Sequence, residues 1–482
     1  MDKGRMECWD QDSQAVSVHL PRIMIAAEKS GGGKTLFTCA LLSLLKEKIR
    51  EVRAFKCGPD YIDPMFHRTV LEIPSRNLDS FFADEDTLRY LLGREVLEME
   101  KFPESRIAVL EGVMGFYDGL GGVSERSSAW EVADLTDTPV ILLVDMKGRS
   151  LSALASIKGF LDYKEKSHVT GIVFNRLSPM LYPGLKERAE RELGIRVFGY
   201  VPELKDLTLE SRHLGLVMPE EILGIRERLD LIKEKVRVGI NLDGIIEEAG
   251  RAAEIEVKLP EAAGWSLSDR IPKKTVVAVA KDEAFCFYYE DNLDLLKKLG
   301  AEIQYFSPIH DRNLPEGTCA VYLGGGYPEL HAKALSENIS MRNAIRQAVM
   351  EEVPCIAECG GYLYLKDSIV DPDGVEWPMA GSRDTGKLGR FGYITVTSKK
   401  EGLLGPAGTE FRAHEFHHWD SEENGTDFAA KKPVGTRGWD CGYTTESFYA
   451  GFPHLYFYSN VKMAANFIRY AKIWKEKNSS QI

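Results

Sequence analysis

Short apolar runs alternate with helix-length amphipathic stretches along most of the chain, and this alternation constrains the fold more than any other feature. One series of apolar runs comprises 23–27, 52–57, 107–110, 140–144, 171–174 and 197–201, and a second comprises 275–280, 302–306, 320–323 and 355–357. The alternation predicts mostly parallel strands joined by crossover helices. We therefore predict an α/β fold with two open, mostly parallel sheets, one for each series.

A charged, helical region separates the two series of strands. At 482 residues the chain is too long for one hydrophobic core, so two domains of about 200 residues each are expected. The predicted segments are an N-terminal extension (1–21), a first domain (22–235), a linker (236–272) and a second domain (273–482) that ends in a helix. That last helix, within 462–477, has apolar residues at helical spacing among lysines. This pattern favours docking on the second domain, with a membrane-surface helix as the alternative.

Charge and cysteine usage limit the kinds of partner that the chain can have. A net charge of -12 disfavours nonspecific binding to nucleic acid or to anionic membranes, which both need a cationic surface. The apolar runs are far shorter than the ~20 residues that span a bilayer, and 1–14 lack the apolar stretch of a secretory signal. The eight cysteines form no C-x-x-C pair. We predict a cytoplasmic protein without nucleic-acid or membrane partners.

The run 23–27 leads into a glycine-rich loop and then into a helix-like stretch, which is the arrangement of a phosphate-binding loop. The loop residues are Ser30, Gly31, Gly32, Gly33, Lys34 and Thr35. Glycines let backbone N–H groups face phosphate oxygens, Lys34 can reach the terminal phosphates, and Thr35 offers a hydroxyl to Mg²⁺. We predict that these six residues bind ATP and that Thr35 is a magnesium ligand. The alternative is a glycine turn that only starts a helix.

The loop departs from the usual phosphate-binding pattern at two positions. Glu28 stands where that pattern has a glycine. Lys29 stands where partitioning-type ATPases carry a signature lysine, which could reach across a dimer to the partner's nucleotide. The loop is therefore a variant, and a homodimer is one arrangement that Lys29 would serve.

Two acidic segments follow predicted strands of the first series. Asp60 and Asp63 come directly after 52–57, and Glu111 ends the strand that begins at 107. In open α/β sheets, ligands bind outside the carboxyl ends of the strands. We predict that Glu111 binds Mg²⁺ and that Asp60 and Asp63 bind the substrate; the alternative is solvated turn acids. Asn175, which closes 171–174, is predicted to contact the nucleotide's adenine, although alone it could be a strand-end cap.

In the second series, Cys359 ends an apolar run and precedes two glycines. A cysteine on a sharp strand-to-helix turn is an exposed nucleophile, and the helix end favours the thiolate. The N–H of Gly360 and a second amide from the glycine loop 324–326, assigned to Gly325, could form an oxyanion hole. His454, near a late strand, is the predicted base, although a lone late histidine is more commonly structural.

A second histidine motif points to different chemistry. His414 to His418 satisfies H-E-x-x-H, the zinc-protease pattern, which needs both histidines one helical turn apart. Aromatic and polar residues interleave between Phe411 and Trp419, which predicts an extended segment instead. We therefore interpret this motif as a pocket histidine or a packed polar strand.

Six segments in order resemble the cobyrinate a,c-diamide synthase family. They are Ser-Gly-Gly-Gly-Lys-Thr (30–35), Cys-Gly-Pro-Asp-Tyr-Ile-Asp-Pro (57–64), Glu-Gly-Val-Met-Gly-Phe-Tyr-Asp-Gly (111–119), Gly-Gly-Gly-Tyr-Pro-Glu-Leu (324–330), Ala-Glu-Cys-Gly-Gly (357–361) and Arg-Ala-His-Glu-Phe-His (412–417). The resemblance implies a dethiobiotin-synthetase-like ATPase domain and a class I glutaminase domain of the cobyric-acid type. It also implies that Cys359 is the thiolate and that His454 activates it.

The activity that this resemblance implies is amidation of the a and c carboxylates of cobyrinate, in an anaerobic-type route to cobalamin. ATP, glutamine and a corrinoid would be the substrates, with Mg²⁺ as cofactor. Many class I glutaminases have a glutamate two residues after the histidine, where this chain has Tyr456, so a Cys-His dyad is the interpretation. The alternatives are the same chemistry on hydrogenobyrinate or nickel-sirohydrochlorin, and a partitioning-type ATPase switch, which leaves Cys359 and His454 unexplained.

Overall fold

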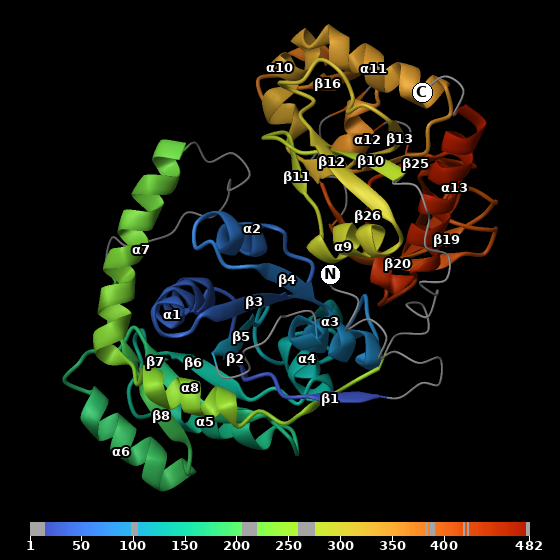
Figure 1. Ribbon diagram of the computed structural model, residues 1–482. Helices are drawn as coiled ribbons and strands as arrows, with labels where there is room; N and C mark the ends of the chain where they lie inside the picture. Colours follow the sequence, from blue (N-terminus) through green and yellow to red (C-terminus); the bar gives the residue numbers. More distant parts are fainter. Residues whose placement is uncertain are drawn as a thin grey trace, which may run out of the picture. The chain divides into compact units, whose positions relative to one another are not determined.

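The computed structural model describes residues 15–97, 105–204, 219–258, 275–380, 384–385, 391–417, 420–421 and 424–478 (Figure 1). The chain forms two compact units, Met1–Pro260 and Glu261–Ile482. Each unit contains its own mostly parallel sheet, and the predicted α/β fold class is confirmed. Within the described residues, no helix is both long enough and apolar enough to cross a bilayer.

The sheet of the first unit has seven strands in the order β4-β3-β5-β2-β6-β7-β8, and its neighbouring strands are parallel. The strands are β2 Arg22–Ala27, β3 Glu51–Cys57, β4 Ser75–Leu78, β5 Arg106–Glu111, β6 Val140–Asp145, β7 Val169–Asn175 and β8 Arg196–Val201. β2 lies at the centre, so the loop that follows it opens where the strand order reverses. Such a reversal is where open α/β sheets bind ligands.

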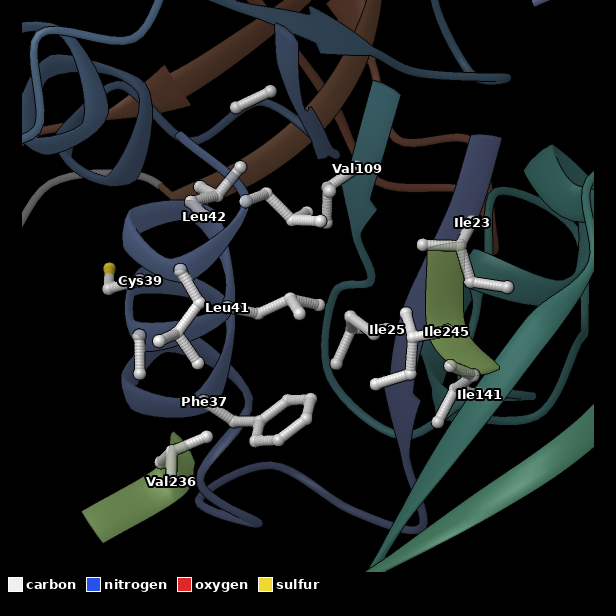
Figure 2. Packing of buried hydrophobic residues seen from close by; sticks show 14 of the residues in the cluster. Ile23, Ile25, Phe37, Cys39, Leu41, Leu42, Val109, Ile141, Val236 and Ile245 are labelled. Carbon is white, nitrogen blue, oxygen red and sulfur yellow. The ribbon is translucent and has the colours of Figure 1, made fainter. Parts of the chain in front are cut away.

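The helices of the first unit follow its strands in sequence. They are α1 Lys34–Lys48, α2 Ile62–Thr69, α3 Glu85–Leu97, α4 Ala129–Leu135, α5 Ala153–Asp162, α6 Tyr182–Leu193, α7 Pro219–Gly239 and α8 Leu242–Gly250. Figure 2 shows side chains of α1, among them Leu41, turned toward Ile25 of β2 and Val109 of β5. Each such buried side chain contributes ~1.5–3 kcal/mol relative to exposure. This packing fixes the start of α1 against the sheet.

The first unit extends beyond the segment that the sequence indicates. Val236 of α7 and Ile245 of α8 are buried in the same core as α1, as Figure 2 shows. The strand β9 (Ile255–Val257) pairs antiparallel with β1 (Val16–Val18). Much of the predicted linker and part of the predicted extension are therefore structured parts of this unit. Most of their charged residues are exposed, with Glu248 as a buried exception, so the sequence pattern does not indicate the few apolar side chains that dock.

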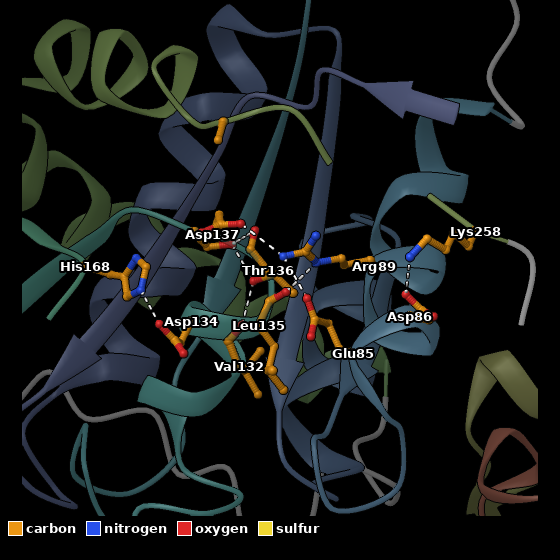
Figure 3. A network of polar contacts seen from close by, with 12 residues as sticks. Glu85, Asp86, Arg89, Val132, Asp134, Leu135, Thr136, Asp137, His168 and Lys258 are labelled. Carbon is orange, nitrogen blue, oxygen red and sulfur yellow. Dashed lines mark hydrogen bonds and ion pairs between the residues drawn. The ribbon is translucent and has the colours of Figure 1, made fainter. Parts of the chain in front are cut away.

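Polar contacts join α3, α4 and the neighbouring strand ends (Figure 3). Arg89 of α3 donates to the Leu135 carbonyl at 2.7 Å and pairs with Asp137 at 3.1 Å. Gly93, on the same helix, leaves room for β9, because a Cβ there would lie 2.2 Å from Val257 Cγ2. The close approach of α3 to β9 thus depends on a helix position without a side chain.

The main sheet of the second unit has six strands in the order β12-β10-β13-β15-β25-β24, with an antiparallel edge at β24. The strands are β10 Thr275–Ala280, β12 Ala301–Phe306, β13 Thr318–Leu323, β15 Cys355–Glu358, β24 Tyr443–Thr445 and β25 Phe448–Gly451. The helices of this unit are α9 Glu290–Lys298, α10 Ala332–Glu337, α11 Ile339–Met350, α12 Gly360–Tyr364 and α13 Lys462–Asn478. β13 and β15 are neighbours, so the loops that follow them lie side by side.

A five-stranded antiparallel sheet, β23-β22-β19-β20-β26, also belongs to the second unit and was not predicted. Its strands are β19 Phe391–Ser398, β20 Glu410–Phe416, β22 Phe428–Lys431, β23 Gly438–Cys441 and β26 His454–Leu455. Short ribbons pair β11 (Phe285–Phe287) with β14 (Gly325–Gly326), β16 (Ser368–Val370) with β17 (Glu376–Pro378), and β18 (Asp384–Thr385) with β21 (Asp420–Ser421). This second sheet places β26 beside β20.

The C-terminal helix α13 packs on its own unit. Met463, Phe467, Ile468 and Ala471 are buried, and the helix contacts β10, β13 and α9. The predicted docking on the second domain is therefore confirmed, since a membrane-surface helix would leave this apolar face for lipid.

Candidate active sites

The phosphate loop joins β2 to α1, as the sequence predicts. Gly31 and Gly33 have φ values of 69° and 90°, the left-handed region that favours glycine. Ser30 and Gly31 are exposed, so the loop opens to solvent. Lys34 begins α1, and its ammonium donates to the Met114 carbonyl, which lies in the Glu111–Gly119 segment. Burial, and then the charge of Lys56, lower the pKa of Lys34 to about 8.

Asn175 braces the loop from the end of β7. Its Nδ2 donates to the Gly32 carbonyl at 2.9 Å, and a Cβ on Gly33 would lie only 2.4 Å from that nitrogen. Its Oδ1 accepts from the backbone N–H of Arg176 at 3.0 Å. The structure thus shows the Asn175 amide engaged with backbone groups, and its contact with adenine stays a prediction.

The two unusual loop residues are held by charge. Glu28 Oε2 lies 2.7 Å from Arg149 Nη1, so a half-buried cation accompanies the acid that replaces glycine. Lys29 Nζ lies 3.2 Å from Asp145 Oδ2, and Arg176 pairs with the same carboxylate. Lys29 is therefore engaged within its own unit in this structure.

Thr35, Asp63 and Glu111 meet in one buried cluster. Thr35 Oγ1 lies 2.7 Å from Glu111 Oε1 and 3.5 Å from Asp63 Oδ2. The ammonium of Lys56, at the end of β3, lies 2.5 Å from Asp63 Oδ2 and 2.8 Å from Glu111 Oε1. The structure therefore brings together two predicted acids and the predicted hydroxyl around a lysine that sequence reasoning missed.

The charges in this cluster depend on one another. Burial raises the pKa of Glu111 to about 7, although Lys56 opposes this effect. Burial would also raise the pKa of Asp63, but the charge and hydrogen bond of Lys56 bring it below its usual value. The two carboxylates in turn keep the pKa of Lys56 well above its usual value, against the effect of its burial. Lys56 is thus a cation held between two acids.

Asp60 and His67 lie next to the cluster. Asp60 Oδ1 accepts from the backbone N–H of Ile62 at 2.7 Å and so caps the start of α2, while burial and the charge of Asp63 raise its pKa. His67 Nε2 is 3.8 Å from Glu111 Oε2, and burial lowers the pKa of His67 to about 4. Sequence reasoning also missed His67, although its place one helical turn after Asp63 could have indicated it.

Cys359 lies between β15 and α12 with φ 47° and ψ -104°. A non-glycine residue rarely adopts this conformation, and such strain is typical of nucleophile turns. Its backbone N–H donates to Gly451 at 2.8 Å, which anchors the turn to β25. The predicted sharp turn is present, and it directs the side chain toward a small pocket. The pocket-lining residues are Phe287, Gly326, Tyr327, Glu329, Cys359, Gly360, Leu363, Phe416 and His417.

The resting charge of Cys359 differs from the expectation that the helix end favours thiolate. Burial, and then the charge of Glu329, raise the pKa of Cys359 well above its usual value, against a hydrogen bond from the Gly360 N–H. The helix has only five residues, so its dipole is small. Burial lowers the pKa of His454 to about 3, which leaves a neutral imidazole at neutral pH. Cys359 is therefore a thiol that needs a base, and His454 can accept a proton.

Two glycines shape the space around these groups. A Cβ on Gly325 would lie 2.4 Å from Cε1 of the His454 ring, so that glycine makes room for the imidazole. Gly326 lines the pocket, and its backbone nitrogen lies 3.1 Å from where a Cβ on Gly360 would stand. The structure thus places Gly326, one residue beyond the predicted Gly325, beside Gly360 on the pocket wall.

The H-E-x-x-H motif lies on a strand. His414 belongs to β20 and pairs in register with His454 of β26, while His418 lies outside the described residues. The predicted extended segment is confirmed. His417 stacks on Phe452 with ring centroids 3.9 Å apart, and it lines the Cys359 pocket. The strand thus contributes to the cysteine site.

Comparisons with known proteins cover both units. Residues 23–217 match the CobQ/CobB/MinD/ParA nucleotide binding domain, and residues 276–461 match the CobB/CobQ-like glutamine amidotransferase domain. A cobyrinate a,c-diamide synthase of Listeria innocua is 37% identical over 91% of this chain and 97% of its own length. The enzyme of the same name from Clostridium acetobutylicum is 36% identical over 93% and 99%, and that from Thermoplasma volcanium is 37% identical over 94% and 98%.

These relatives share both units with the chain, in the same order and over almost their whole length. Their identity exceeds the level at which only the fold would be shared. The chain belongs to the cobyrinate a,c-diamide synthase family, with an ATP-binding unit followed by a glutamine amidotransferase unit.

Proposed function

We propose that the chain amidates the a and c side-chain carboxylates of cobyrinate, with ATP as the activating substrate and glutamine as the ammonia donor. The observation that carries this proposal is the presence, in one chain, of a phosphate loop beside a lysine-acid cluster and of a strained cysteine with a buried neutral histidine. Activation is needed because a carboxylate is a poor electrophile. Each amidation would consume one ATP and one glutamine.

In the first unit, a substrate carboxylate oxygen would attack the γ-phosphorus of ATP, and ADP would leave. Lys34 is placed to hold the terminal phosphates, and Lys56 is placed to pair with the substrate carboxylate or with the acyl phosphate that forms. Ammonia would then attack the acyl carbon, and inorganic phosphate would leave as the amide forms. A buried cation such as Lys56 is suited to stabilise the negative charge of either group.

The same cluster fits Mg²⁺. Mg²⁺ prefers one or two carboxylates together with substrate phosphates. Thr35 and Asp63 offer oxygens, and Glu111 Oε2 is buried and accepts no hydrogen bond from the residues that the structure describes, with His67 Nε2 3.8 Å away. Bound there, Mg²⁺ would neutralise phosphate charge during transfer. We propose Thr35 and Glu111 as the residues that would hold it.

In the second unit, Cys359 would attack the carboxamide carbon of glutamine after His454 takes the thiol proton. His454 would pass that proton to the departing ammonia, which leaves a thioester. Water would then hydrolyse the thioester to glutamate and restore the thiol. The N–H groups of Gly360 and Gly326 are suited to stabilise the oxyanions that form in both steps.

Two variants test whether one unit activates the carboxylate and the other releases ammonia from glutamine. Cys359→Ala should abolish glutamine-dependent amidation but retain synthesis from high ammonium, because only the ammonia source is lost. Lys34→Ala should stop amidation from either source and leave glutamine hydrolysis. Cys355→Ala, a buried thiol on the same strand, is the control and should keep both activities. Amidation by Lys34→Ala near the wild-type rate would contradict the phosphate-loop assignment.

Mass spectrometry of the products identifies the acid. The protein, with ATP, Mg²⁺ and glutamine, is incubated separately with cobyrinate, hydrogenobyrinate and nickel-sirohydrochlorin. We expect two carboxylate-to-amide conversions on cobyrinate. Conversion of another acid alone would support the same chemistry on a different substrate.

A cytoplasmic location and a homodimer remain predictions, and sedimentation of the purified chain tests the homodimer.

A further inference from the structure

Glu358 is a buried acid that the mechanism above does not use. It is the last residue of β15, directly before Cys359, and is only 1% exposed. Its Oε1 accepts a hydrogen bond from the Tyr322 hydroxyl at 2.9 Å, and the backbone N–H of Leu455 donates to the same carboxyl group. These two donors fix the carboxyl group between β13 and β26.

The other carboxyl oxygen faces the histidine of the site. Glu358 Oε2 lies 3.8 Å from His454 Nδ1, and both side chains are almost fully buried. Catalytic hydrogen bonds are often long in unliganded structures and tighten when substrate binds. With Nδ1 turned to Glu358, the ring nitrogen left to take the proton of Cys359 is Nε2.

Tyr456, two residues after His454, makes its contacts with other residues. The Tyr456 hydroxyl donates to Asp291 at 3.1 Å, and its ring packs edge-on against Tyr289 with centroids 5.1 Å apart. A tyrosine in that network cannot supply a carboxylate to His454. Glu358 offers one from the end of β15, directly before the nucleophile.

We propose that Glu358 is the positioning residue of a Cys359–His454–Glu358 triad, in which the acid precedes the cysteine instead of following the histidine. This inference rests on the glutaminase function proposed above and deepens it. As a carboxylate, Glu358 would accept the Nδ1 proton of His454, hold the tautomer whose Nε2 carries no proton, and stabilise the imidazolium that forms when Cys359 gives up its proton.

The protonation of Glu358 adds a pH signature. Burial raises its pKa to about 8, so the Glu358–His454 pair holds an extra proton at neutral pH. That proton, on the Glu358 carboxyl group, must leave before Glu358 can act on His454 as a carboxylate. Among the described residues, the other titratable groups that interact with the pair are the hydroxyls of Tyr288, Tyr322 and Tyr449, the thiol of Cys359, and the imidazoles of His414 and His417.

The decisive experiment measures glutamine hydrolysis by the full chain and by Glu358→Gln over pH 6 to 9.5. The amide keeps the volume and the acceptor for Tyr322, but its N–H₂ facing Nδ1 imposes the wrong tautomer. We expect kcat to fall about 10²- to 10⁴-fold with KM within about threefold, as for other triads whose tautomer is reversed. In the wild type, kcat/KM should rise with pH to an inflection near 8 that the variant lacks.

Three controls separate this role from a structural one. Glu358→Gln should amidate from high ammonium at the wild-type rate, because the first unit is intact. Glu358→Asp should recover part of kcat, and Tyr456→Phe should have the wild-type kcat.

Glu358→Gln with wild-type kcat and pH profile would overturn the inference. If Cys359→Ala also retained glutamine hydrolysis, the proposed function itself would fail. The wild-type pH profile remains informative even if Glu358→Gln does not fold.

Discussion

Lys56 shows how much a single buried residue can decide at the residue scale. In the sequence it is one of three charged residues in the strand Glu51–Cys57, and only the structure places its ammonium 2.5 Å from Asp63 and 2.8 Å from Glu111. Asp63 and Glu111 were predictable because they follow strands. Lys56 was not, since lysines at strand ends are usually solvated.

Lys56→Met tests this residue. Loss of the cation leaves two acids buried without their partner, so the unfolding free energy should fall by about 3 kcal/mol. Amidation should be lost even with high ammonium, while glutamine hydrolysis stays. Urea denaturation and the two activity assays measure these effects. Lys158→Met, which removes an exposed lysine paired with Asp162, is the matched control. Wild-type amidation by Lys56→Met would contradict the role given to Lys56.

At the element scale, the loop between β2 and α1 is fixed by a partner far away in sequence. The predicted strand, glycine loop and helix are all present. The contact of Asn175 with the loop follows from the strand order β2-β6-β7, in which β7 is separated from β2 by one strand only. The residue types of the loop are predictable from the sequence, but the strand order decided which side chain supports it.

Gly33→Ala tests this brace. Its φ of 90° disfavours a side chain by roughly 1–2 kcal/mol, and the Cβ would stand 2.4 Å from Asn175 Nδ2. We expect ATP affinity, measured by calorimetry, to fall at least about tenfold. Gly148→Ala controls for backbone strain alone, because that glycine also has positive φ but its Cβ position has no atom of the described residues within 4 Å. Equal ATP affinity in both variants would show that the close approach to Asn175 has no effect.

At the scale of the whole molecule, each unit buries neutral histidines, His67 in the first and His414 and His454 in the second. Burial lowers their pKa values to about 4, 3 and 3 respectively. An unfolded histidine titrates near 6.5. Below that pH the unfolded chain binds more protons than the folded chain, so this part of the stability is complete above pH 6.5 and is lost as the pH falls toward 4.

His67→Gln should therefore reduce the acid sensitivity of the first unit. Relative to that variant, the wild type should lose about 2 kcal/mol of unfolding free energy between pH 7 and pH 5. Urea denaturation at pH 7, 6 and 5 measures the loss. The transition of the first unit is identified as the one that added ATP moves to higher urea concentration. Parallel stability curves for the two proteins would contradict the buried, neutral state of His67.

The sequence by itself determined the two α/β units, the phosphate loop, the nucleophile turn at Cys359 and the docked terminal helix. Periodicity, glycine placement and strand-end chemistry are local properties, so a linear pattern records them. The tertiary structure decided which residues come into contact. It places Lys56 between two acids, Asn175 against the phosphate loop, Gly326 on the pocket wall, and Glu358 beside His454. It also decided that the charged region after α7 joins the first unit. These contacts join residues distant in sequence through sheet order and burial, which no local pattern encodes.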